Sequence, residues 1–164
     1  MTTKIKFAKI NPYAIIPTKR KEDAGYDIYP CFKKPYIAIM PHETKMIPTG
    51  IASACDEDFC FVLKERGSTG TKGIAQRCGI IDSGYRNEWF VPVTNTSDKL
   101  LVIGDENEIE RFKNYDVIFY PTTKAICQAL VIPVPDSLVE EVSYDELVKI
   151  ASERGMGALG SSNK

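Results

Sequence analysis

A carboxylate in a tight turn is the first feature of this sequence that could do chemistry. Asp82 follows the apolar pair Ile80-Ile81 and precedes Ser83-Gly84. Glycine accepts the backbone angles that a tight turn needs, so this pattern predicts two strands joined by a hairpin turn. Two strands would hold such an acid in place, as a catalytic carboxylate requires. Aspartate is also common where it only initiates a turn.

Residues 65–73 form a second segment, which is rich in groups that bind anions. It combines two cations, three hydroxyls and three glycines. Glycines let backbone N–H groups approach a ligand closely, and such amides beside a cation suit phosphate oxygens. Because Gly73 follows Lys72, the spacing is not that of a P-loop. The segment predicts either a phosphate-binding loop or a plain flexible loop.

A third segment places an acid inside a strand-like run. Asp27 lies in Ala24-Gly25-Tyr26-Asp27-Ile28. Such a carboxylate is either a solvent-facing strand residue or a ligand to a hydrated metal. Mg²⁺ keeps several of its waters and is commonly held by one carboxylate together with substrate phosphates.

The chain ends in a tail, residues 152–164, that is rich in glycine and serine and poor in apolar side chains. Such a tail cannot offset its own ordering entropy, so we expect it to be flexible without a ligand. It is either a free tail or an arm that orders over a ligand, with Arg154 as an anion donor.

These segments need a framework, and the sequence predicts one made of short strands. Ten prolines and eleven glycines punctuate the predicted strands, which are residues 5–9, 26–29, 36–40, 44–47, 50–53, 59–64, 75–81, 88–94, 100–103, 117–120 and 127–133. This pattern favours an all-β fold, a distorted barrel or jelly-roll-like sandwich. A capping box from Ser143 to Glu146 predicts one short C-terminal helix. We expect one domain, residues 1–151, followed by the arm, residues 152–164.

Composition narrows the classes of function. A net charge of -1 gives no basic surface for nucleic acid. No apolar run approaches membrane-spanning length, and the first residues lack the apolar core of a signal peptide, so we expect a cytoplasmic protein. The five cysteines include no CxxC pair and His42 is the only histidine. A zinc site and a Ser/His or Cys/His triad are therefore not expected.

Taken together, the segments resemble the trimeric dUTPases, which hydrolyse dUTP to dUMP and pyrophosphate. Five motifs of that family occur in order, at residues 24–28, 66–68 with 72–74, 79–86, 124–128 and 154–162. One such match would be weak, whereas five in order are specific. The resemblance implies a homotrimer of distorted β-barrel or jelly-roll subunits with one short C-terminal helix and a flexible arm. Each active site would draw motifs from all three chains.

The resemblance also assigns roles around the turn. Asp82 would be the general base that polarises a water for attack on the α-phosphate. Tyr85 would lie against the deoxyribose and leave no space for a 2′-hydroxyl. Backbone groups around Gly79, Ile80 and Ile81 would read the uracil edge, which cytosine cannot match.

Further roles concern the phosphate chain. The residues implied to hold it are Arg66, Gly67, Ser68, Gln128 and Arg154. Ser161, in the arm, is also implied to bind substrate. Mg²⁺ would bridge the phosphates and offset charge on the leaving group, and Asp27 would hold a metal-bound water.

The arm departs from the family at Leu159, where a phenylalanine usually stacks over uracil. Our hypothesis is that Phe90, just past the turn, supplies the missing aromatic face, with Trp89 as the second candidate. Both are equally compatible with ordinary core or interface aromatics.

Two other functions remain open from the sequence. The same fold serves dCTP deaminases and bifunctional deaminase–dUTPases, which need an acid that reaches the base; beyond Asp82 the turn offers only Glu88. The other is a non-catalytic binding module that has kept the nucleotide pocket.

Overall fold

The computed structural model describes residues 3–77 and 79–157. Within them the chain is mostly β-structure. The strands are β1 (Ile5–Lys9), β2 (Tyr26–Ile28), β3 (Tyr36–Ile39), β4 (Thr44–Pro48), β5 (Ile51–Cys55), β6 (Phe59–Lys64), β7 (Ile74–Gln76), β8 (Ile80–Ile81), β9 (Phe90–Asn95), β10 (Leu100–Gly104), β11 (Val117–Pro121) and β12 (Cys127–Pro133). The short helices are α1 (Gly67–Gly70), η1 (Glu106–Glu108), α2 (Ile109–Phe112) and α3 (Tyr144–Leu147). The expectation of an all-β fold is confirmed.

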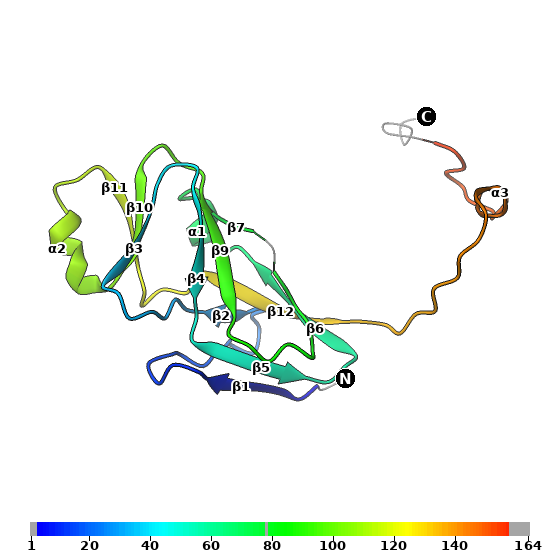
Figure 1. The fold of residues 1–164 in the computed structure, drawn as a ribbon, viewed down its shortest axis with the longest axis horizontal. Helices are drawn as coiled ribbons and strands as arrows, with labels where there is room; N and C mark the ends of the chain where they lie inside the picture. The colour runs from blue at the N-terminus through cyan, green and yellow to red at the C-terminus, as the bar shows by residue number, and fades with distance from the viewer. Residues whose placement is uncertain (1–2, 78, 158–164) are drawn as a thin grey trace.

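The strands form small sheets that surround one interior (Figure 1). Their orders are β1-β5, β11-β10-β3, β2-β12-β6-β8 and β4-β9-β7. All pairs are antiparallel except β10 with β11. Among the described residues, none of the antiparallel pairs joins two strands that follow one another in the chain. The predicted hairpin around Asp82 is therefore wrong: β8, before the turn, pairs with β6, whereas β9, after it, pairs with β4 and β7.

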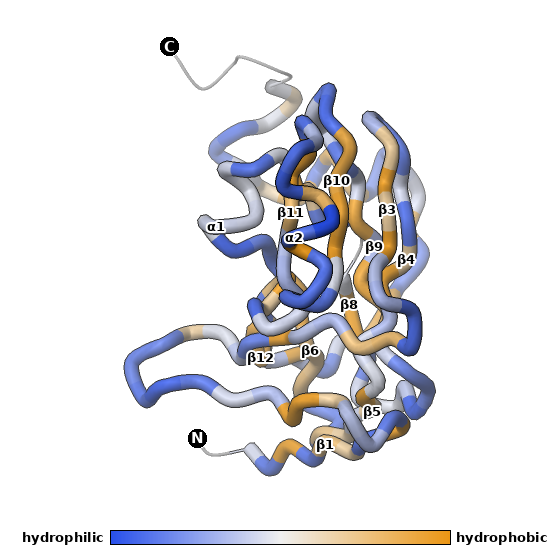
Figure 2. Tube along the Cα trace, turned by 90° about the vertical axis from the view of Figure 1, so that its left-hand side faces the viewer, coloured by the Kyte–Doolittle hydropathy of each residue, from blue (hydrophilic) through white to orange (hydrophobic). Residues whose placement is uncertain are grey.

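The core is built from the inward faces of these strands. Trp89 is fully buried and packs edge-on against Phe7 and Phe61, with ring centroids 5.6 and 5.0 Å away. Figure 2 shows the hydrophobic stretches on strands such as β3, β9 and β10 and the hydrophilic ones in the loops. Burial of this apolar surface is the main term that holds the strands together.

The predicted strand over residues 75–81 is wrong as a single element, because the chain changes sheets there. β7 pairs with β9, whereas β8 pairs with β6. Gly79 lies at the change, and a Cβ at this position would come within 2.9 Å of the Leu63 Cβ. The close approach of two chain segments requires glycine at this point.

The predicted C-terminal helix is confirmed as α3. The Ser143 hydroxyl accepts a bond from the Glu146 N–H at 3.2 Å, and the Glu146 carboxylate accepts one from the Ser143 N–H at 2.9 Å. The sequence reading missed α1, η1 and α2, which are too short to show a helical hydrophobic period.

The chain leaves the body of the fold after β12. In Figure 1 this segment extends outward and carries α3 at its far end. Its apolar side chains are exposed, with Leu138 and Val139 100% and 98% accessible. In the described part of the chain, no helix combines the length and apolar character needed to cross a membrane.

Candidate active site

One pocket of about 200 Å³ forms around the turn that carries the acid. We call it the hairpin pocket after the chain reversal between β8 and β9, although these two strands do not pair with each other. Its lining residues are Met46, Ile80, Ile81, Asp82, Tyr85 and Phe90. The structure thus brings five residues predicted from the sequence into one place. Met46 was not predicted, because it comes from β4 and reaches the pocket only through the pairing of β4 with β9.

Backbone and side-chain bonds fix the turn. The Tyr85 N–H donates to the Asp82 carbonyl at 3.1 Å, and the Tyr85 hydroxyl donates to the Glu88 carbonyl at 3.0 Å. The Arg86 guanidinium donates to the Ser83 carbonyl at 2.5 Å. The Asp82 side chain is exposed, so it can reach a water or a ligand while its backbone is held.

Phe90 and Trp89 face opposite sides of the chain, as successive strand residues do. Phe90 is 37% exposed and lines the hairpin pocket, whereas Trp89 is buried in the core. Of the two aromatic candidates, only Phe90 is accessible to a ligand in this subunit.

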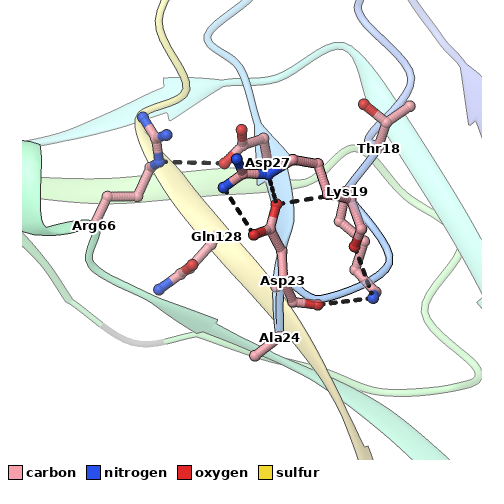
Figure 3. Close-up of a pocket in the computed structure, with 9 residues that line it drawn as sticks. Thr18, Lys19, Asp23, Ala24, Asp27, Arg66 and Gln128 are labelled. Carbon is pink, nitrogen blue, oxygen red and sulfur yellow. Dashed lines mark hydrogen bonds and ion pairs between the residues drawn. The ribbon is translucent and has the colours of Figure 1, made fainter.

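A second pocket, of about 630 Å³, lies at the end of β6 and along β2, and we call it the Arg66 pocket (Figure 3). Its lining residues are Thr18, Lys19, Arg20, Asp23, Ala24, Gly25, Asp27, Arg66 and Gln128. Predicted residues from three separate segments meet here: Asp27, Arg66 and Gln128.

Strand register accounts for this meeting. Gln128 on β12 stands opposite Asp27 on β2, and paired residues share one face of a sheet. The Asp27 carboxylate contacts the Arg66 Nε at 3.2 Å, and the Arg66 Nη1 donates to the Ala125 carbonyl at 3.2 Å. Gly25 makes room, since a Cβ there would come within 3.0 Å of the Gln128 side chain.

The segment after Arg66 turns into α1. The Thr69 hydroxyl accepts from the Arg66 N–H at 3.1 Å and donates to the Arg66 carbonyl at 2.9 Å. Gly67 and Ser68 are exposed in the first turn of α1, directly beside the Arg66 pocket but outside its lining. The first amides of a helix have no partner within it, which leaves them able to bind an anion.

Two buried groups support the Arg66 pocket from behind. The Tyr120 hydroxyl donates to the Ala125 carbonyl at 2.6 Å, the same carbonyl that Arg66 contacts, and burial raises the pKa of Tyr120. Burial also raises the pKa of the Cys127 thiol to about 12, so this cysteine stays protonated and unreactive near neutral pH. Tyr120 has no sequence signal that links it to the site.

The two pockets lie far apart in one chain, because β2 and β8 are opposite edges of one sheet. Three strand spacings, roughly 14 Å, separate these edges. The two residues also differ in position along the strands. Asp27 pairs with Gln128 of β12, whereas Ile81 pairs through Phe61 of β6 with Val131 of β12. Gln128 and Val131 are three residues, or roughly 10 Å, apart along β12. Along the surface of the sheet, Asp27 and Ile81 are therefore about 17 Å apart.

The arm does not reach either pocket in the described residues. Arg154 is exposed in the outward segment, and its Nε donates to the Gly157 carbonyl at 3.0 Å. Leu159 and Ser161, which the sequence analysis singled out, lie outside the described residues. Gly79 lies beside the hairpin pocket, next to Ile80.

Comparison with known proteins shows the family to which the chain belongs. The dUTPase family model matches residues 11–112. This chain belongs to the dUTPase family. The deoxyuridine 5′-triphosphate nucleotidohydrolase of Nautilia profundicola is 31% identical over 98% of this chain and 99% of its own length. That of Clostridioides difficile is 32% identical over 96% of both chains.

Solved dUTPase structures share the fold. A variant of the Staphylococcus bacteriophage 80alpha dUTPase with dUpNHpp superposes with a TM-score of 0.75, at 21% identity, over 97% of this chain and 98% of its own. The dUTPase of phage phi11 of S. aureus gives 0.67 over 85% of this dUTPase and 96% of its own chain, at 18% identity.

Proposed function

We propose that this dUTPase, which hydrolyses dUTP to dUMP and pyrophosphate, uses Asp82 as the general base. The observation that carries the proposal is the hairpin pocket, where an exposed carboxylate stands beside the Ile80-Ile81 strand and the Tyr85 ring. The carboxylate accepts a proton from a water as that water attacks the α-phosphate, and pyrophosphate leaves from the opposite side.

The hairpin pocket takes the deoxyuridine. Tyr85 lies against the sugar, and its ring is held by the bond from its hydroxyl to Glu88. Backbone groups of Gly79, Ile80 and Ile81 pair with the uracil edge, so that cytosine leaves buried groups without partners. Phe90 provides the aromatic face beside the base.

The Arg66 pocket takes the phosphate chain. Arg66 and Gln128 line it, and Gly67 and Ser68 follow Arg66 at its rim. A guanidinium gives planar, paired N–H donors that match phosphate oxygens. Arg154 and Ser161 of the arm complete the phosphate contacts when the arm closes over the substrate.

Asp27 fits a Mg²⁺ ion that is bound mainly by substrate. Among the described residues no group of three or more His, Cys, Asp or Glu side chains is placed to hold a metal. A single partly exposed carboxylate is nevertheless what Mg²⁺ needs when phosphates and waters complete its shell. The bound ion would offset charge on the phosphates and on the leaving pyrophosphate. Asp27 would hold one of its waters.

We further propose that the enzyme is a homotrimer with shared sites. A water activated by Asp82 cannot attack a phosphate bound roughly 17 Å away beside Asp27 of the same chain. A neighbouring subunit must therefore bring its hairpin pocket to the Arg66 pocket. The exposed apolar residues of the outward segment, Leu138 and Val139 among them, supply a surface for such contacts.

A dCTP deaminase is less well supported. The second acid of the turn, Glu88, accepts a hydrogen bond from the Gly50 N–H at 2.7 Å and does not line the hairpin pocket. Its carboxylate is occupied in holding the turn against the chain before β5.

The test is pyrophosphate release from dUTP with Mg²⁺, run beside dCTP, dTTP and UTP. We expect turnover of dUTP alone, and Asp82→Asn should lower kcat by at least about a hundredfold, the usual contribution of a general base. Release of ammonia from dCTP would favour the deaminase. A purely binding role would leave all four nucleotides intact.

A further inference from the structure

The Arg66 pocket has a wall to which the mechanism above gives no role. Residues 18–23 form a loop before β2, and Thr18, Lys19, Arg20 and Asp23 of this loop line the pocket. In Figure 3, Lys19 lies on the side of Asp27 that faces away from Arg66. The pocket is therefore bounded by cations on two opposite sides.

The loop is fixed to the outer edge of β2. The Asp27 N–H donates to the Thr18 carbonyl at 3.0 Å. The Lys19 ammonium donates to the carbonyls of Asp23 at 2.7 Å and Arg20 at 3.3 Å. These bonds restrain the Lys19 ammonium in the wall of the pocket, so that the side chain is not free to rotate in solvent.

The charges of the lining residues do not cancel. Arg20 forms two bonds with the Asp23 carboxylate, at 2.8 and 3.0 Å, and Arg66 contacts Asp27. The hydrogen bond from Arg20 lowers the pKa of Asp23, which keeps that carboxylate charged. Among the described residues the Lys19 ammonium forms no ion pair with a carboxylate, although its charge also lowers the pKa of nearby Asp23. The lining carries three cations against two carboxylates. An ammonium has three N–H donors, and two of them go to the carbonyls of Asp23 and Arg20. The ammonium also lies 5.7 Å from the centroid of the Tyr26 ring, a contact that a ligand oxygen would replace or share at the third donor.

We propose that Lys19 binds the pyrophosphate part of dUTP, with Arg20 as a second donor. This inference rests on the proposed function, because it assumes that the phosphate chain enters the Arg66 pocket. The α-phosphate must meet the water activated by Asp82, so the β- and γ-phosphates, which carry most of the charge, remain for the wall of residues 18–23. Lys19 and Arg20 then discriminate triphosphate from monophosphate, and Asp23 competes with the substrate for Arg20.

Two substitutions with opposite expected effects test this. Lys19→Met keeps most of the side-chain stem and removes the charge; we expect binding of inorganic pyrophosphate to weaken about five- to tenfold. The KM for dUTP should rise by a similar factor, while kcat and the affinity for dUMP change less than about twofold. Asp23→Asn frees Arg20 and should tighten pyrophosphate binding about two- to threefold.

The measurement is calorimetric titration of the full-length protein, in Mg²⁺ buffer, with inorganic pyrophosphate and with dUMP separately. Lys21→Met is the matched control, since Lys21 is exposed in the same loop and does not line the pocket. Its pyrophosphate affinity should equal that of the wild type.

Unchanged pyrophosphate binding in Lys19→Met would overturn the inference, and so would equal weakening toward pyrophosphate and dUMP, which would mean that the loop only supports the pocket. Weaker pyrophosphate binding in Asp23→Asn would also overturn it, because it would show that the bond between Arg20 and Asp23 only holds the loop in shape. A wild type that binds pyrophosphate but does not turn over dUTP would instead overturn the proposed function and leave the role of Lys19 to be decided by the titrations.

Discussion

Single residues in this dUTPase have environments that their sequence neighbours do not share. Trp89 and Phe90 are adjacent, yet the first is wholly buried and the second is 37% exposed beside Asp82. Strand alternation explains the difference, because β9 turns one face to the core and the other to the hairpin pocket. Met46 is on the neighbouring strand β4, opposite Pro92, and so lies diagonal to Phe90 on the same face of the sheet. A flexible thioether and an aromatic ring together make an adaptable apolar wall for a base.

Removing the Phe90 ring should therefore weaken substrate binding. We expect Phe90→Ala to raise the KM for dUTP about tenfold, since stacking of a base on an aromatic ring is worth about 1–3 kcal/mol. Steady-state kinetics would measure this, with Tyr13→Ala as the control, because Tyr13 is an exposed aromatic outside the hairpin pocket. An unchanged KM would show that Phe90 does not serve the base.

At the scale of elements, the sheet β2-β12-β6-β8 does most of the positioning. It carries Asp27 on the edge strand β2 and Gln128 on the inner strand β12, and Arg66 lies two residues after the end of β6. Gly25 lets β2 lie close to β12, since a Cβ there would come within 3.0 Å of two atoms of Gln128.

Gly25→Ala should disturb both the sheet and the site. Gly25 is buried, so the added methyl forces the Gln128 side chain or a strand to shift, and overpacking of this kind costs about 1–3 kcal/mol. We expect a lower denaturation midpoint and weaker dUTP binding. Gly70→Ala is the control for stability, because nothing lies within 4 Å of a Cβ at Gly70. Equal midpoints for the two variants would show that the contact with Gln128 relaxes without cost.

The same elements show how far the sequence could predict the fold. Most strands and α3 were predictable, because short apolar runs between turn residues and a capping box are local signals. The break between β7 and β8 was not, because it depends on pairing with β9 and β6, which are distant in sequence. The candidate site divides in the same way. Motif residues such as Asp82 could be proposed from the sequence, whereas Lys19 and Met46 line their pockets because of how the chain folds.

At the scale of the whole molecule, the two pockets proposed to form the site lie apart within one chain. The hairpin pocket and the Arg66 pocket are at opposite edges of one sheet, and the segment after β12 extends away from the body (Figure 1). The proposed homotrimer would bring them together, because in a closed rotational assembly each subunit can give its hairpin pocket to one neighbour and receive that of another.

This arrangement predicts that two inactive variants restore each other. Asp82→Asn and Arg66→Ala should each be nearly inactive alone. Mixed trimers, formed by unfolding and refolding the two variants together, contain sites where the intact Asp82 of one chain meets the intact Arg66 of another. When equal amounts of the two variants mix at random, about a quarter of the shared sites receive both an intact Asp82 and an intact Arg66.

Activity near that fraction in the dUTP assay would therefore show that the site is shared. The control is the same refolding with Asp82→Asn and the double variant Asp82→Asn/Arg66→Ala, which should stay inactive because no chain in that mixture carries Asp82. If each site used both residues from one chain, the first mixture would be as inactive as its components, since every chain lacks one of the two. The distance of about 17 Å between Asp27 and Ile81 within a subunit makes recovery the expected result.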